Sequence, residues 1–101
     1  MAITQTLTDT FLQDCLDGAH NLGNGGDTLK IALYTSSATL GATTSAYTAT
    51  NEVSGTGYTA GGATLASQAV AYDATNQVAF FDAADPAFTT ATITARGALI
   101  Y

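Results

Sequence analysis

Side chains that could exchange protons are scarce in this chain, which has one histidine, His20, and one cysteine, Cys15. A serine or cysteine nucleophile needs a base such as histidine to accept its proton. The sequence contains no Gly-x-Ser-x-Gly turn that would present a serine. His20 is expected at a helix end, where its charge would suit the helix dipole, and Cys15 is expected to be buried among apolar residues. We therefore expect no catalytic residues and no enzyme activity.

One glycine-rich stretch and one group of aspartates could hold a ligand. The stretch GTGYTAGG, residues 55–62, has the glycines of a phosphate-binding loop but lacks the lysine and the βαβ setting. Asp82 and Asp85 flank a predicted turn and could bind calcium with help from Asp73. Calcium takes about six to eight oxygen ligands, and no D-x-D-x-D-G loop supplies them. We therefore expect no metal ion and no cofactor.

The chain is acidic, with a formal net charge of −6 and two basic residues, Lys30 and Arg96. Phosphate contacts need clustered lysines and arginines, so this composition argues against nucleic-acid binding. Both basic residues fall in predicted strands, where we expect ion pairs with Asp82 or Glu52. No apolar run approaches the roughly 20 residues of a membrane span, and the N-terminus does not resemble a signal peptide. We expect no contact with nucleic acid or membranes.

A long tract after the first predicted strand carries almost no charge. Only 10% of the 101 residues are charged, against about 25% in an ordinary soluble domain. Threonine, alanine and glycine dominate residues 35–62, a stretch too long for a simple hairpin turn. We interpret residues 43–62 as a surface excursion pinned by Tyr47, Val53 and Tyr58. A surface rich in hydroxyls and methyls suits lasting contact with another protein.

The N-terminal part predicts one helix, from about residue 8 to about residue 22. Apolar residues recur there at helical spacing, with aspartates on the opposite face. Thr10 with Gln13 fits a capping box, and Thr8 could cap a slightly earlier start. Gly23 would end the helix. We expect the apolar face to pack on a sheet; its residues are Leu7, Phe11, Leu12, Cys15, Leu16, Ala19 and Leu22.

The rest of the chain, from about residue 28 to residue 101, is predicted to be β-rich. Leu29, Ile31 and Leu33 alternate with smaller or polar residues, as in a half-buried strand. Residues 63–72 and 77–83, separated by the turn DATN, predict a local hairpin with Val78 and Phe80 facing inward. A last strand is expected over residues 91–101. We predict a single mainly-β domain over residues 1–101, a β-sandwich or barrel-like fold with one N-terminal α-helix.

Two strings in this β-rich part resemble a known family. NEVSGTGYTAGG, preceded by KIALYTSSATL, and ARGALIY near the C-terminus are similar to segments of small structural proteins from tailed bacteriophages and prophages. The order also matches: a short helix, a strand, the NEVSGTGYTAGG segment, a hydrophobic hairpin, an aspartate-proline turn and the ARGALIY strand. Members of that family continue past this last strand, so either this chain is a short member or a C-terminal strand is missing from it.

The resemblance implies a structural role in the virion. Its most concrete form is a capsid decoration, or cement, protein that clamps subunits of the major capsid protein and associates with itself as a dimer or trimer. The protein would be made in the host bacterial cytoplasm and would lie on the capsid surface, with the major capsid protein and other virion proteins as partners.

Two other roles stay open. Within the virion, the chain could be a tail, head-tail joining or baseplate component. From a different class, it could be a carbohydrate-binding module on the phage surface, with Tyr34, Tyr47, Tyr58 and Tyr72 stacking on sugars. For the structural role, the candidate partner contacts are Tyr34, Tyr47, Glu52, Val53 and Tyr58.

Overall fold

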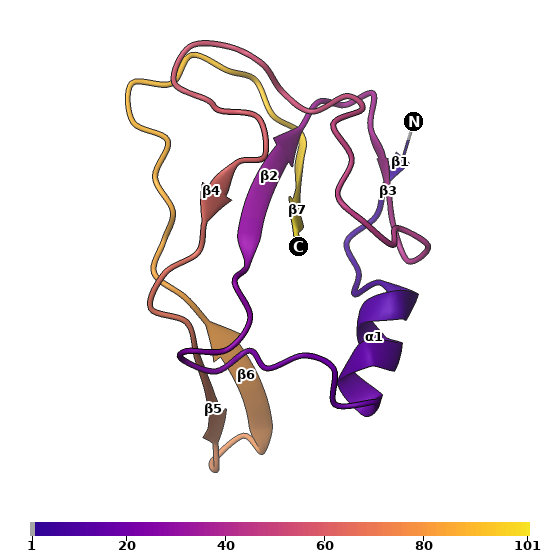
Figure 1. Cartoon of the computed structure of the whole chain (residues 1–101), viewed down its shortest axis with the longest axis vertical. Helices are drawn as coiled ribbons and strands as arrows, with labels where there is room; N and C mark the ends of the chain where they lie inside the picture. Colours follow the sequence, from indigo (N-terminus) through magenta and orange to yellow (C-terminus); the bar gives the residue numbers. More distant parts are fainter. Residues whose placement is uncertain (1) are drawn as a thin grey trace.

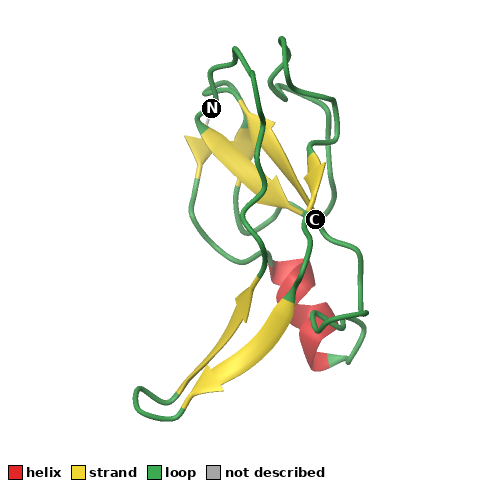
Figure 2. Cartoon of the chain, turned by 90° about the vertical axis from the view of Figure 1, so that its left-hand side faces the viewer, coloured by secondary structure: helices red, strands yellow, loops and turns green. Residues whose placement is uncertain are grey.

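The computed structural model describes residues 2–101, which form seven short strands and one helix (Figure 1). The sheets that hold the core lie together, whereas the helix and one hairpin extend from them as two separate projections (Figures 1 and 2). In chain order the elements are β1 (Ala2–Ile3), α1 (Asp9–Leu16), β2 (Lys30–Tyr34), β3 (Thr39–Leu40), β4 (Ala63–Thr64), β5 (Ala69–Asp73), β6 (Val78–Asp82) and β7 (Gly97–Ile100).

The described strands form three small sheets. In the largest, β2 lies between β4 and β7 and pairs antiparallel with both. β1 and β3 pair in parallel, and β5 and β6 form an antiparallel hairpin. The chain is therefore mainly β with one short helix, as predicted, and no closure into a barrel is found among the described strands.

The predicted strand over residues 63–72 is divided into β4 and β5. Between them Ser67 adopts a positive φ of 54°, which interrupts the extended backbone. The next residue, Gln68, is buried, and its amide nitrogen donates to the carbonyl oxygens of Leu22, Gly23 and Asp27 at 3.2, 3.0 and 2.9 Å. This anchor directs the first part of the predicted strand to β2 and the second part to the hairpin.

The core lies on the face of β2 opposite to the one predicted. Ala32 and Tyr34 are fully buried, whereas Ile31 and Leu33 are only partly buried. Ala38 and Leu40 complete the buried cluster, and partly buried apolar residues pack around it: Ile3, Tyr47, Leu99 and Tyr101. The alternation was a correct sign of a strand, but the largest buried side chain, Tyr34, decides the buried face.

The helix is shorter than predicted. It begins at Asp9 because Thr8 caps it, with the side-chain oxygen accepting from the Phe11 N–H at 3.3 Å. It ends at Leu16, because Gly18 turns the chain with a φ of +74°. His20 therefore lies outside the helix, where its ring stacks on Phe11 and its nitrogens lie 3.4 and 3.0 Å from the carboxylates of Asp14 and Asp27.

The predicted packing of the helix on a sheet is wrong. No helix residue is buried, Leu16 is 90% exposed, and Cys15 is exposed as well. The helix projects separately from the hairpin and covers no sheet (Figure 1). Within the described residues, no helix has the length and the apolar character needed to cross a bilayer.

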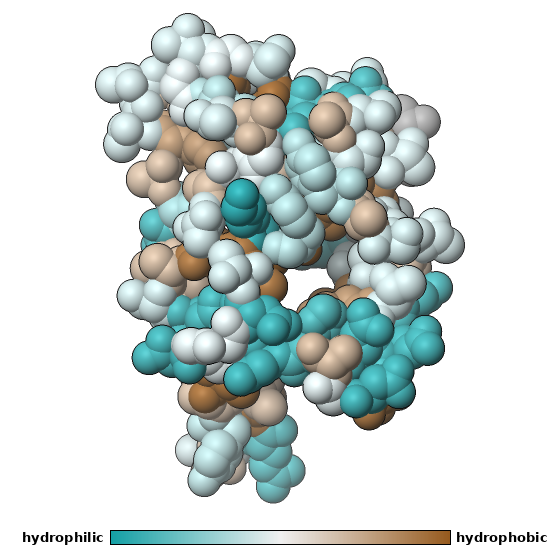
Figure 3. Space-filling model, viewed as in Figure 1, coloured by the Kyte–Doolittle hydropathy of each residue, from teal (hydrophilic) through white to brown (hydrophobic). Residues whose placement is uncertain are grey.

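The inward face of the hairpin is also different from the prediction. Phe80 and Val78 are 46% and 50% exposed, whereas Phe81 is partly buried. Apolar surface is visible on the hairpin below a band of hydrophilic residues (Figure 3). Both faces of this strand carry large apolar residues, so alternation alone could not identify the inward one.

Candidate functional site

The long excursion between β3 and β4, residues 41–62, is fastened to the edge of the central sheet; we call it the pinned loop. Glu52 forms an isolated antiparallel bridge with Tyr34 of β2. Backbone bonds reinforce this bridge, from Thr35 N–H to the Asn51 carbonyl at 2.9 Å and from Val53 N–H to the Leu33 carbonyl at 3.0 Å. The middle of the loop therefore extends the sheet beside β4, and its two flanks run over the surface.

The carboxylate of Glu52 collects three hydrogen bonds from within the chain. The hydroxyls of Tyr47 and Tyr58 donate to its two oxygens at 2.5 and 2.6 Å, and the Gly61 N–H donates at 2.7 Å. The Tyr58 hydroxyl also accepts from the Leu33 N–H of β2 at 2.9 Å. Charge-assisted hydrogen bonds of this kind are about twice as strong as neutral ones. Glu52 therefore ties both flanks of the loop to the sheet.

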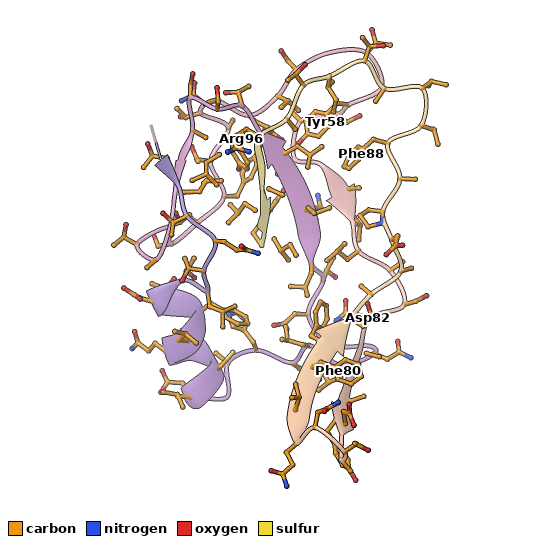
Figure 4. The ribbon with its side chains drawn as sticks, turned by 180° about the vertical axis from the view of Figure 1, so that it is seen from behind. Tyr58, Phe80, Asp82, Phe88 and Arg96 are labelled. Carbon is orange, nitrogen blue, oxygen red and sulfur yellow. The ribbon has the colours of Figure 1, made fainter. Side chains whose placement is uncertain are left out.

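Aromatic contacts hold the same loop at further points. The Tyr34 hydroxyl donates to the Thr48 carbonyl, and the Tyr101 hydroxyl donates to the Gly61 carbonyl, each at 2.7 Å. The ring of Tyr101 stacks on Tyr47 with 4.7 Å between centroids. Tyr58 lies against Phe88, with ring centroids 5.4 Å apart (Figure 4).

The environment of this cluster shifts its pKa values. Burial alone would raise the pKa of Glu52, but the hydrogen bonds from Tyr47, Tyr58 and Gly61 outweigh it and hold the pKa below its ordinary value. The hydrogen bond to Glu52, followed by burial, raises the pKa of Tyr47 to about 12. Burial, followed by the hydrogen bond to Glu52, raises the pKa of Tyr58 to about 12. The cluster is therefore held together best with Glu52 ionised and both tyrosines protonated.

We expect the folded chain to lose stability at both ends of the pH scale because of this cluster. Glu52 contributes stability above its ordinary pKa of 4.5, and this is lost as pH falls through the lower pKa of the folded state. Tyr47 and Tyr58 contribute stability below pH 10, and this is lost as pH rises toward about 12. Urea unfolding across a pH series measures both limbs. Tyr58→Phe removes one titrating hydroxyl and should flatten the alkaline limb; an unchanged alkaline limb would contradict this assignment.

The candidate contact residues hold the loop from within. Tyr34 and Val53 are buried inside the chain, so their side chains are not presented at the surface. Tyr47, Glu52 and Tyr58 are partly buried, and their polar atoms bond to the loop and to β2. One feature of the sequence could have indicated this cluster. Glu52 is the only charged residue in residues 31–72, and it has a tyrosine on each side.

The exposed side of the pinned loop is made of small, uncharged residues. Most of the exposed residues have hydroxyl or methyl side chains: Ala42, Thr43, Ser45, Ala46, Ala49, Thr50, Ser54, Thr56, Thr59 and Ala60. The other exposed residues are Asn51, Gly55 and Gly57. An open hollow beside the loop is lined by threonines, Leu40 and Tyr47, with no carboxylate, histidine or cysteine. This surface offers hydrogen bonds and methyl contacts, and it does not bring together the groups of an acid-base catalyst.

The ion pairs expected for the two basic residues are not found. Among residues 2–101, no carboxylate lies within salt-bridge distance of Lys30 or Arg96; the described pairs involve His20. Arg96 and Asp82 lie in different parts of the molecule (Figure 4). Tyrosine hydroxyls take the place of a cation at Glu52. Asp73, considered above as a calcium ligand, accepts from the Asn76 side chain and from the backbone N–H groups of Thr75 and Asn76, and these bonds lower its pKa.

No protein-family model matches the sequence, and neither the curated proteins nor the solved structures contain a match to the chain.

The NEVSGTGYTAGG and ARGALIY strings lie on opposite edges of β2. Tyr34 bridges to Glu52 of the first string on one edge and pairs with Gly97 of the second on the other. Arg96 N–H also donates to the Tyr34 carbonyl at 2.7 Å. The two strings therefore build the central sheet from both sides.

Proposed function

We propose that this chain is a structural protein of a bacteriophage virion, without enzyme activity, and that it decorates the capsid by laying the pinned loop across the major capsid protein. The observation that carries the proposal is the construction of this loop. Its tyrosines and its only carboxylate are used internally, while its outer side is uncharged and rich in hydroxyls and methyls. A loop that is already ordered loses little conformational entropy when it binds.

The arrangement of the tyrosines favours this role over sugar binding. Of the four tyrosines that could stack on a carbohydrate, Tyr34 is buried, and the rings of Tyr47 and Tyr58 pack on Tyr101 and Phe88. Only Tyr72, which is 76% exposed, presents an open ring, and it lies on the hairpin away from the others. A sugar platform of several aromatic rings is therefore not assembled.

Attachment through the pinned loop should survive high salt. Coulombic contacts between exposed charges are screened within about 3 Å at molar ionic strength, whereas hydroxyl, backbone and methyl contacts are not. In the experiment, phage particles are assembled without this protein and the purified protein is then added. The fraction of the protein that sediments with the particles is measured across a salt series. Retention up to molar salt is expected, and release as salt rises would contradict an uncharged clamp. Binding to tails in place of heads would assign the tail or baseplate role.

Two matched variants test the loop itself. Ala46→Arg and Thr50→Arg each place a long cation on the exposed side of the pinned loop, and we expect each to lower retention about tenfold or more by preventing close contact. Thr75→Arg makes the same change in charge in the exposed turn between β5 and β6, away from the pinned loop (Figure 1), and should leave retention unchanged. Equal retention of all three variants would contradict the loop as the contact surface.

A further inference from the structure

The hairpin β5–β6 is the least covered sheet of the molecule. Each of its strands has only the other as a hydrogen-bonded neighbour. It extends away from the sheets that contain the core (Figures 1 and 2). Two-stranded hairpins are marginally stable in water without a third strand or a packing partner. The hairpin therefore lacks the neighbour that would stabilise it.

Both faces of this hairpin carry exposed apolar side chains. The pairs Val70–Phe81 and Tyr72–Ala79 lie on one face, and the pairs Ala69–Asp82, Ala71–Phe80 and Asp73–Val78 lie on the other, which therefore also carries two carboxylates. Val70 and Tyr72 are 57% and 76% exposed, so the first face is open around β5, and Val78 and Phe80 leave the second face open around β6. A partner that covers one face would leave the apolar side chains of the other face in water. A strand added at the edge places side chains next to those of β5 on both faces.

The outer edge of β5 has little that would keep another strand from pairing with it. β6 occupies one edge of β5, and among the described strands none pairs with the other edge. The sequence of β5, AVAYD, contains no lysine or proline, and its one charged residue, Asp73, is the last of the strand. Natural edge strands are usually protected by such residues, because a free edge otherwise pairs with another strand.

We propose that β5 pairs antiparallel with β5 of a second copy of this chain, around a two-fold axis at Ala71, to form a four-stranded sheet shared by the two copies. In this register Val70 lies opposite Tyr72 of the second copy, and Tyr72 opposite Val70. Aromatic and β-branched residues form favourable cross-strand pairs. The interface is isologous, which is the common arrangement of dimers.

The charges of the hairpin agree with a second copy as the partner, although the chain carries a net charge of −6. The only charge in β5 is Asp73, at its end, and the two-fold register places it opposite Ala69 of the second copy. The two Asp73 carboxylates then lie at opposite ends of the ladder, about 14 Å apart for four residues at 3.4 Å each. This separation exceeds the screening length of about 8 Å at physiological ionic strength. Asp82 of the second copy, which pairs with its own Ala69, is nearer to Asp73, at about 10 Å across two strand spacings, and this distance also exceeds the screening length. Like charges therefore oppose the pairing only weakly.

A matched pair of substitutions tests the register by sedimentation velocity of the full chain over a micromolar-to-millimolar concentration series. Ala69→Lys places an ammonium between Asp82 of its own copy, its partner in the hairpin, and Asp73 of the second copy. The contact with Asp73, made twice per dimer, should tighten the dimer about 2- to 30-fold. Ala71→Lys places two ammonium groups directly opposite each other at the axis, and this single like-charge pair should weaken the dimer about 1.4- to 5-fold. Both variants make the same change on the same face of the same strand, with opposite expected signs. The tightening by Ala69→Lys should disappear at molar salt.

Ala79→Lys on β6 is the control and should leave the dimer unchanged, and circular dichroism of each variant shows whether the fold is kept. A wild-type chain that stays monomeric at millimolar concentration would overturn the proposal. Effects of the same sign for Ala69→Lys and Ala71→Lys would overturn the register, and weakening by Ala79→Lys equal to that by Ala71→Lys would assign the contact to β6. The proposal is independent of the virion role, because the dimer is measured on the isolated protein.

Discussion

Replacement of Tyr34 by alanine should lower the free energy of unfolding by about 3–5 kcal/mol, as for other buried aromatic residues. Tyr34 is fully buried at the centre of a small cluster with Ala32, Ala38 and Leu40. Its hydroxyl also holds the pinned loop through the Thr48 carbonyl. Domains of this size have a total stability of about 5–15 kcal/mol, so Tyr34→Ala should be close to unfolding. Urea denaturation at neutral pH measures the loss.

Two further variants distinguish the contribution of the Tyr34 ring from that of its hydroxyl, and the effect of a buried tyrosine from that of an exposed one. Tyr34→Phe keeps the ring and leaves the Thr48 carbonyl without its donor, which should cost about 1 kcal/mol. Tyr72→Ala removes an exposed ring on the hairpin and should change stability by about 0.5 kcal/mol or less at concentrations where the chain is monomeric. Similar losses for Tyr34→Ala and Tyr72→Ala would contradict the position of the core.

Replacement of Gly62 by alanine should lower the free energy of unfolding by about 2–4 kcal/mol, from backbone strain and a steric clash together. Gly62 has a φ of +77°, and a Cβ atom there would lie 1.8 Å from the carbonyl oxygen of Ile31 in β2. The next residue, Ala63, begins β4 and pairs with Ile31. Relief of the clash therefore requires the end of the pinned loop to move away from the central strand.

Gly25→Ala is the matched control for this substitution. Gly25 has a φ of +83°, close to that of Gly62, but nothing lies within 4 Å of the position of its Cβ. Only the cost of the left-handed conformation should remain, about 1 kcal/mol. Urea denaturation of both variants measures the difference. Equal losses at the two positions would mean that close approach to β2 is not what requires glycine at position 62.

Features encoded by short stretches were predicted well from the sequence. The hairpin turn DATN was identified because Asp73 is a residue that typically accepts hydrogen bonds from the backbone two and three positions ahead, as it does from Thr75 and Asn76. The helix start was recognised within two residues, because a threonine cap has a local signature. Its end was missed, since the apolar spacing continued past Gly18 although the backbone did not.

Features that depend on distant residues were not predictable in the same way. Periodicity identified β2 as a strand, but the burial of Ala32 and Tyr34 depends on Leu40 and on the loop that returns from residues far along the chain. The role of Glu52 depends on two tyrosine hydroxyls that fold onto it from opposite flanks. The spacing of apolar residues in the helix and the hairpin predicts that they are covered, but it does not say which part of the molecule would cover them.

The pairing of β2 with β7 also has a consequence for the order of folding. Ile31 pairs with Ile100, so the central sheet joins segments from nearly opposite ends of the described chain, whereas β5 and β6 are neighbours in sequence. Contacts of high sequence separation incur loop-closure entropy before they contribute stability, and they form slowly. During synthesis β2 lacks one of its two neighbouring strands until β7 leaves the ribosome. Until then Tyr34 also lacks its pairing with Gly97. The hairpin can form early, whereas the sheet beside the buried core is completed only after β7 has been translated.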